Sequence, residues 1–270
     1  MSDAIRVGLV GYGYASKTFH APLISGTPGL ALTTVSSSDA AKVHADWPGA
    51  KVVSAAGELL NDPEIDLVVI ATPNDTHFPL AKAALEAGKH AVVDKPFTVP
   101  LSQARELESL AKHCGRVLSV FHNRRWDSDF LTVRTLIDEG LLGEVCYFES
   151  HFDRFRPQVR QRWREQAGPG SGIWYDLGPH LLDQAVVLFG LPVSITVDLA
   201  QLRPAIHRLF SRGAGLSTAA GGAARHIARR RGERALYRPR LAGQLYQVRS
   251  RPAGGAAEKW RAFAAGGLGV

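Results

Sequence analysis

The sequence contains little sulfur, with two cysteines and one methionine among 270 residues. Cys114 and Cys146 lack the spacing of a metal site or a disulfide framework, so we interpret both as small buried side chains and expect no metal. The chain also lacks the run of about 18 apolar residues that a membrane-spanning helix needs. Its first residues enter a strand pattern without the apolar core of a signal peptide. We therefore expect a cytoplasmic protein with no membrane partner.

The net charge of +7 is unevenly distributed. Residues 205–270 hold 12 arginines and one lysine against two glutamates, a net charge of +11, whereas residues 1–204 carry −4. Alanine, glycine and arginine account for 38 of these last 66 residues, without a helical or strand period. We expect this basic tail to be poorly ordered. A nucleic-acid-binding arm is the alternative, but aromatic interleaving and amphipathic order are lacking, so we expect no nucleic-acid partner.

Strands and helices alternate through the first 122 residues. Buried strands are predicted at residues 5–10, 30–35, 66–71, 90–93 and 117–121. Helical patterns at residues 15–23, 39–45, 76–87 and 102–113 separate them. This alternation predicts an α/β domain over residues 1–122, with the doubly wound parallel sheet of the Rossmann fold.

The pattern changes after residue 122. A helix is predicted at 128–139, followed by an alternating strand at 144–152, a helix from 173 to 188 and another strand at 193–199. Alternating apolar and polar residues indicate a sheet with one exposed face. Residues 123–204 are therefore predicted to begin a second, α+β domain with an open sheet.

A glycine loop follows the first strand and opens a helix. Gly11, Tyr12, Gly13 and Ser16 form the pattern Gly-x-Gly-x-x-Ser, typical of a dinucleotide-binding turn in this context. The first glycine permits the tight turn, and the second lets the backbone approach a pyrophosphate at the helix N-terminus. Ser16 is small enough to replace the usual third glycine or alanine. A glycine turn without a ligand is the alternative.

Three serines end the second strand, where an acidic residue usually binds the adenosine ribose. An acidic side chain there repels a 2′-phosphate, so Ser37 and Ser38 favour NADP over NAD. Asp39 lies close, however, and no arginine follows directly. A serine turn that caps the next helix is the alternative.

Polar residues also follow the next two strands. Thr72, Pro73 and Asn74 come after one of them, with His77 one helical turn further on, and Lys95 comes after the other. Ligands of open α/β sheets bind at the carboxyl ends of the strands, so these residues are candidates for the site. A solvent-facing lysine is the alternative for Lys95.

Asp176 and His180 are four residues apart at a predicted helix start and therefore share one helix face. A histidine transfers protons near neutral pH, and a neighbouring carboxylate can tune it. A surface polar contact is the alternative. Metal binding is not favoured, because no third ligand is suitably spaced.

Together these motifs resemble the glucose–fructose oxidoreductase and inositol dehydrogenase family (Gfo/Idh/MocA) over residues 3 to about 204. The resemblance rests on Val-Gly-Tyr-Gly at 10–13, Ala-Thr-Pro-Asn with His77, Asp94-Lys95-Pro96, where the family most often has Glu-Lys-Pro, and Asp176-x-x-x-His180. Segments 14–22, 121–127 and 172–176 are similar to the bacterial branch of scyllo-inositol dehydrogenases.

This resemblance implies hydride transfer between a nicotinamide, in NADP or NAD, and a carbinol or ketone carbon of a small polyol or sugar. Lys95 and His180 would transfer protons, and Asp176 would place the substrate or orient the histidine. The implied pocket residues are Asn123, Arg124, Trp163 and Arg164. The cofactor-binding set is Gly11, Tyr12, Gly13, Ser16, Ser37, Ser38, Thr72, Pro73, Asn74, His77 and Lys95. A non-catalytic dinucleotide-binding regulatory protein is the alternative.

The family's second domain continues well beyond the matched residues, as an open sheet that walls the pocket and usually forms the oligomer interface. The resemblance therefore implies a truncated second domain here. Codons permitted for residues 205–216, read one base later, can encode a strand-like segment similar to that sheet. We predict that residues from about 205 to 270 are out of frame, that activity is impaired and that the family's homo-oligomer is doubtful for this chain.

Overall fold

A computed structural model of the chain describes residues 4–152, 168–200, 210–217, 240–241 and 244–251. The chain divides into two compact units, residues 1–122 and 123–270. Within the described ranges, no helix is long and apolar enough to cross a membrane.

The first unit is built on a six-stranded parallel sheet with the order β3-β2-β1-β4-β5-β6. Its strands are β1 (Ile5–Val10), β2 (Leu30–Ser36), β3 (Lys51–Val53), β4 (Leu67–Ile70), β5 (His90–Asp94) and β6 (Leu118–Phe121). The strand order reverses at β1, which has β2 on one side and β4 on the other. Doubly wound sheets bind ligands at this reversal, beside the carboxyl ends of the strands. The predicted Rossmann sheet is confirmed, and the short β3 is an addition to it.

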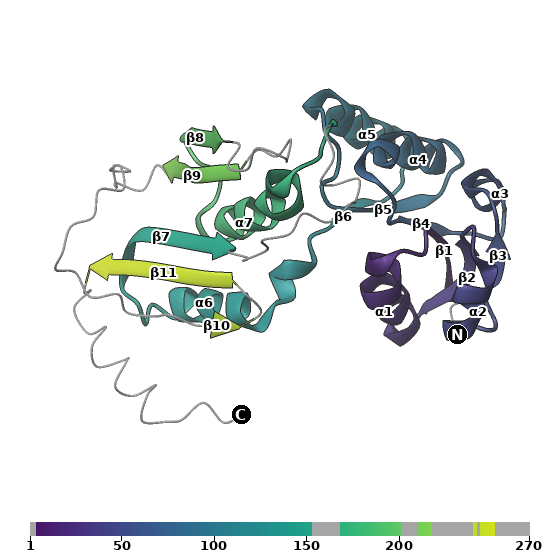
Figure 1. Cartoon of the computed structure of the whole chain (residues 1–270), viewed down its shortest axis with the longest axis horizontal. Helices are drawn as coiled ribbons and strands as arrows, with labels where there is room; N and C mark the ends of the chain where they lie inside the picture. Colours follow the sequence, from purple (N-terminus) through teal and green to yellow (C-terminus); the bar gives the residue numbers. More distant parts are fainter. Residues whose placement is uncertain (1–3, 153–167, 201–209, 218–239, 242–243, 252–270) are drawn as a thin grey trace. The chain divides into compact units, whose positions relative to one another are not determined.

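Helices cover both faces of this sheet. They are the π-helical η1 (Ser16–His20), α1 (Ala21–Gly26), α2 (Ala40–Asp46), α3 (Ala56–Leu60), α4 (Asn74–Glu86) and α5 (Leu101–Cys114). Val69 packs in a cluster with residues of α1 and α2, whereas Val68 and Ile70 pack with residues of α3, α4 and α5. Figure 1 shows α4 and α5 side by side. Burial on both faces explains why the strands are continuous apolar runs in the sequence.

The second unit contains two small antiparallel sheets. Its elements are the 3-10 helix η2 (Asn123–Trp126), α6 (Ser128–Asp138), β7 (Glu144–Phe152), α7 (Ile173–Phe189), β8 (Ser194–Ala200), β9 (Phe210–Ser217), β10 (Arg240–Leu241) and β11 (Gln244–Arg251). β11 lies between β10 and β7, and β8 pairs with β9 (Figure 1). Phe130 and Val133 of α6 form the core of this unit with Tyr246 and Val248 of β11.

The presence of β9 and β11 corrects the expectation that no strand period persists after residue 204. In β11, Tyr246 and Val248 are both buried and stand two residues apart, which is the period of a strand. The average composition of the tail concealed this short alternation. Apart from β9, β10 and β11, the residues of the tail lie outside the described ranges.

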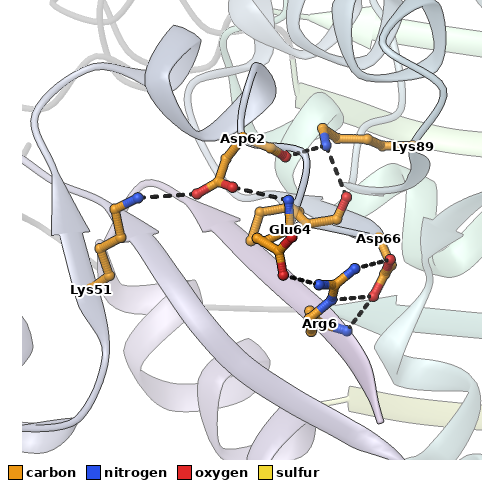
Figure 2. Close-up of polar contacts among 7 residues, drawn as sticks. Arg6, Lys51, Asp62, Glu64, Asp66 and Lys89 are labelled. Carbon is orange, nitrogen blue, oxygen red and sulfur yellow. Dashed lines mark hydrogen bonds and ion pairs between the residues drawn. The ribbon is translucent and has the colours of Figure 1, made fainter. Parts of the chain in front are cut away.

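An ion pair joins the amino-terminal ends of β1 and β4 (Figure 2). Arg6 donates side-chain hydrogen bonds of 3.0 Å to both carboxylate oxygens of Asp66, and its backbone N–H donates a third of 2.9 Å. These bonds lower the pKa of Asp66 from 3.8 to about 2. Arg6 also pairs with the exposed Glu64. The pair therefore fixes the start of two neighbouring strands.

Lys89, just before β5, is a buried cation at the same edge of the sheet (Figure 2). Its ammonium donates hydrogen bonds of 2.6 and 2.8 Å to the carbonyl oxygens of Asp62 and Ile65. The Asp62 carboxylate in turn binds Lys51 at 3.0 Å. Because a buried ammonium must be hydrogen-bonded, these carbonyls fix the loop before β4 against the start of β5.

We predict that Asp66→Asn lowers the free energy of unfolding at neutral pH by about 1 kcal/mol, a figure reduced because the pair is partly exposed to solvent. Folding lowers the pKa of Asp66, so its contribution is present above the unfolded value of 3.8 and is lost as the pH falls through about 2. Urea unfolding across this pH range measures the effect. The matched control Glu64→Gln removes the exposed partner and should change stability by less than about 0.5 kcal/mol. A loss that does not shrink with acid would contradict this account.

Candidate cofactor and proton-transfer site

The glycine loop joins β1 to η1 at the reversal of strand order. Gly11 has a φ of +88°, and a Cβ there would lie 2.9 Å from the carbonyl oxygen of Ala71. Both the backbone conformation and the adjacent chain therefore require glycine at this position. A Cβ on Gly13 would meet no described atom within 4 Å. The space beside Gly13 fits the approach of a cofactor pyrophosphate, so the loop can accommodate a dinucleotide.

Two side chains of the loop are buried beneath it. The Tyr12 hydroxyl donates a 2.9 Å hydrogen bond to Asp46 of α2, and burial together with this bond raises the pKa of Tyr12 to about 12. Ser16 is fully buried, and its Oγ has no hydrogen-bond partner among the described residues. Tyr12 therefore anchors the loop to α2 with its side chain, which leaves its backbone as the part that can face a cofactor.

A cation lies where the serine turn meets the glycine loop. The Lys42 ammonium donates a 3.0 Å hydrogen bond to the carbonyl oxygen of Tyr12. Asp39, the acidic residue near the predicted ribose site, accepts a 2.9 Å hydrogen bond from the Lys42 backbone N–H and caps α2. Ser37 is half-buried and Ser38 is exposed. The sequence analysis missed Lys42 because it sought a cation directly after the strand, whereas the first turn of α2 brings this residue back.

His77 connects the loops that follow β4 and β5. The ring is fully buried, with Nδ1 2.9 Å from the carbonyl oxygen of Pro96 and Nε2 3.0 Å from that of Thr72. Carbonyl oxygens only accept, so a neutral ring makes one of these hydrogen bonds and a protonated ring makes both. Asn74 is buried at the start of α4, and Pro73, which precedes it, is exposed. His77 therefore acts within the protein, holding the two loops together.

Lys95 is half-buried and directly follows β5. Its backbone N–H donates a 2.7 Å hydrogen bond to Oδ1 of Asp94, and its peptide bond to Pro96 is cis. Burial disfavours the charged form of Asp94, but His20 and the Lys95 N–H outweigh this effect and keep the pKa of Asp94 below its ordinary value. The structure thus places Lys95 at the same sheet edge as the glycine loop, beside a buried carboxylate.

In the second unit, Asp176 and His180 lie one turn apart on α7. His180 is 5% exposed, and Asp176 is half-buried. Asn123 begins η2, and the Arg124 guanidinium binds Asp127 at 2.6 Å and lies 4.8 Å from the centre of the Phe152 ring. The remaining predicted pocket residues, Trp163 and Arg164, lie outside the described residues.

A buried hydrogen-bond chain fixes η2 against α7. Gln184 donates a 2.9 Å hydrogen bond to the Arg124 carbonyl oxygen and accepts one of 3.0 Å from the Tyr246 hydroxyl. Burial raises the pKa of Tyr246, so its hydroxyl remains a donor. Arg125 adds two exposed bonds of 2.7 and 2.6 Å to Asp183 of α7. Sequence reasoning missed Tyr246, because it lies in the basic tail.

Within the described part of the chain, no cluster of three or more His, Cys, Asp or Glu side chains could hold a metal ion. Among the described residues of the first unit, the proton-binding side chains at the carboxyl edge of the sheet are Lys95 and the buried His20, His77 and Asp94. These groups bind and transfer protons.

The two loop glycines give a matched pair of substitutions. Gly11→Ala should lower the free energy of unfolding by about 1–3 kcal/mol, because it forces a side chain into a left-handed conformation against a carbonyl. Gly13→Ala should leave stability unchanged and weaken dinucleotide binding on the order of tenfold, because its methyl group enters the pyrophosphate space. Urea unfolding and fluorescence titration with NADPH measure the two effects. Unchanged NADPH affinity in Gly13→Ala would argue against this location of the cofactor.

The sequence of the chain is similar to those of known proteins. Residues 5–122 match the model described as "Oxidoreductase family, NAD-binding Rossmann fold", and residues 130–228 match that of the "GFO/IDH/MocA C-terminal domain". The chain is 80% identical over 204 residues to the oxidoreductase YdgJ of Escherichia coli (strain K12), covering 76% of this chain and 59% of YdgJ.

One further relative and one solved structure are also similar to the chain. The scyllo-inositol 2-dehydrogenase (NADP(+)) IolW of Bacillus subtilis (strain 168) is 40% identical over 201 residues, covering 74% of this chain and 56% of IolW. A solved structure from Yersinia pestis has a TM-score of 0.75 and 68% identity, covering 81% of this chain and 62% of that one. The chain thus spans less than two thirds of the length of these relatives. With both of its units matched, the chain belongs to the Gfo/Idh/MocA oxidoreductases, whose first domain is an NAD-binding Rossmann fold.

Proposed function

We propose that this chain is an NAD(P)-dependent dehydrogenase that acts on a carbinol or ketone carbon of a small polyol or sugar, inositol-like in its chemistry. The observation that carries this proposal is the position of Lys95, at the carboxyl edge of the sheet and beside the loops that fit a dinucleotide. The name of IolW, which is an inositol dehydrogenase, supports the substrate class. When bound, the nicotinamide accepts or supplies the hydride.

Lys95 exchanges a proton with the reacting hydroxyl group. As an amine it accepts this proton, and as an ammonium it stabilises negative charge on the substrate oxygen. His180 is the second proton-transfer group of the proposal, with Asp176 placing the substrate or orienting the imidazole. Asn123 and Arg124, together with Trp163 and Arg164, provide polar contacts to substrate hydroxyls.

NADP is the preferred cofactor in this proposal. Ser37 and Lys42 form the 2′-phosphate site, since the Lys42 ammonium is hydrogen-bonded to the glycine loop and its backbone N–H to Asp39, which follows the serines. Asp39 does not oppose a phosphate strongly there, because its carboxylate caps α2 through the Lys42 N–H. The cofactor named for IolW supports the same preference.

Lys42→Ala should raise the Kd for NADP on the order of tenfold and leave the Kd for NAD nearly unchanged, because it removes one charge-assisted contact to the 2′-phosphate. Lys42→Arg should retain most of the NADP affinity. Isothermal titration with both cofactors measures this, and Lys51→Ala, a lysine at the opposite edge of the sheet, is the control. Equal losses for NADP and NAD would place Lys42 away from the 2′-phosphate.

We further propose that the tail impairs activity, because residues from about 205 are out of frame. The match to YdgJ covers 204 residues, or 76% of this chain, and residues 205–270 carry a net charge of +11. In this proposal the family's open sheet is incomplete, and with it the wall of the pocket and the oligomer interface.

The test is a paired assay of this chain and a version with the frame restored, following reduced-cofactor absorbance with NADP or NAD and a panel of inositols and sugars. We expect cofactor binding by both proteins and robust turnover only by the restored one. Robust turnover by the 270-residue chain would contradict the proposal that its tail impairs activity. Cofactor binding by both without any turnover would instead favour a non-catalytic, dinucleotide-binding regulatory protein.

A further inference from the structure

Tyr12, between the two glycines of the loop, makes a contact through its hydroxyl that packing alone does not require. The residue is 5% exposed and belongs to an apolar cluster that includes Val43 of α2. A phenylalanine would suit this cluster as well, but the Tyr12 hydroxyl donates a 2.9 Å hydrogen bond to Oδ2 of Asp46. Because burial and this bond raise the pKa of Tyr12 to about 12, the hydroxyl is a donor at neutral pH. The bond to Asp46 is therefore what tyrosine adds at this position.

Asp46 is the last residue of α2, and its carboxylate binds two segments of the cofactor loop region. Its Oδ1 accepts a 2.9 Å hydrogen bond from the ammonium of Lys17 in η1, and the Lys17 backbone N–H donates one of 3.0 Å to the Gly13 carbonyl oxygen. Hydrogen bonds from Lys17 and Tyr12 keep the pKa of Asp46 below its ordinary value. An acidic residue in the last turn is unfavourable for the helix itself. Asp46 is thus connected to Tyr12 directly and to Gly13 through Lys17.

We propose that Asp46 is a positioning residue that orders the glycine loop before the cofactor binds, an inference that rests on dinucleotide binding at this loop, part of the proposed function. The loop backbone at Tyr12 and Gly13 is the part that approaches the pyrophosphate. If the hydrogen bond to Asp46 is removed, the cofactor must order the loop as it binds, and its affinity falls. The pyrophosphate is common to NAD and NADP. Asp46 therefore affects both cofactors, unlike Lys42, whose proposed contact is the 2′-phosphate.

Three substitutions separate the hydrogen bond from the charge of Asp46. Tyr12→Phe removes the donor without changing any charge, and Asp46→Ala removes the acceptor. Asp46→Asn removes the charge but keeps an amide oxygen that can accept from the Tyr12 hydroxyl. The measurement is the Kd of NADH and of NADPH by fluorescence titration of the 270-residue chain, at a temperature well below the thermal unfolding of every variant. NADH is used for the Asp46 variants, because a change of charge would act separately on a 2′-phosphate.

We expect Tyr12→Phe to raise the Kd of NADH and that of NADPH by the same factor, about fivefold. Asp46→Ala should raise the Kd of NADH by at least as much, and Asp46→Asn by less than about twofold. Adding Tyr12→Phe to Asp46→Ala should cause no further loss, since both remove the same hydrogen bond. An unchanged Kd in Tyr12→Phe, equal losses in Asp46→Asn and Asp46→Ala, or multiplied losses in the double variant would overturn the proposal.

The matched control is a carboxylate–lysine pair away from the loop. Glu106→Ala, which removes the partner of Lys82, should leave the Kd of both cofactors unchanged. If Asp46→Ala loses the folded circular dichroism spectrum, Asp46→Leu, which keeps a branched shape without an acceptor, replaces it with the same expectations.

The same titrations distinguish failure of this inference from failure of the proposed function. If the expected changes in Kd appear but even the chain with the frame restored turns over no inositol or sugar, the proposed function fails and the role of Asp46 stands. Turnover by the restored chain together with an unchanged Kd in Tyr12→Phe would have the opposite meaning. A native chain that binds neither cofactor would overturn both.

Discussion

A fully buried imidazole joins two loops at the carboxyl edge of the parallel sheet. His77 lies between the carbonyl oxygens of Thr72 and Pro96, so its ring fills the space between the segment after β4 and the segment after β5 and hydrogen-bonds to at least one of them. The glycine loop is placed by the same neighbourhood, because Gly11 packs against the carbonyl of Ala71, next to Thr72. The relative positions of the glycine loop and of Lys95 therefore depend on how one buried histidine packs between two backbone carbonyls.

The two edges of this sheet contain different kinds of polar contact. At the amino-terminal edge, Arg6, Asp66 and Lys89 satisfy one another or nearby carbonyls, so this edge contributes to stability and register. At the carboxyl edge, two buried side-chain atoms, Ser16 Oγ and His20 Nε2, have no hydrogen-bond partner among the described residues. Incomplete pairing of this kind is expected where a protein reserves groups for a ligand or for proton transfer.

The elements that could be predicted from the sequence are those marked by neighbouring residues, such as a run of apolar residues or a helix N-cap. β1 was predicted with its observed bounds because both faces are buried, and the helix beginning near Asp39 was predicted from its N-cap. Lys42 and His20 were missed as site residues because their significance comes from contacts with residues distant in sequence, Tyr12 and Asp94. β3 has three residues, too few for a periodic signal, and β11 was hidden by the alanine, glycine and arginine around it.

Pairing of β11 with β7 places few requirements on the sequence of β11. Backbone hydrogen bonds to β7 require only an extended chain, and the side-chain contribution to the core comes from Tyr246 and Val248, two residues apart. Many unrelated sequences contain such a pair. Pairing at this edge is therefore permissive with respect to sequence. The core of the second unit therefore depends on β11 through two side chains, whereas the glycine loop depends at Gly11 on the absence of one.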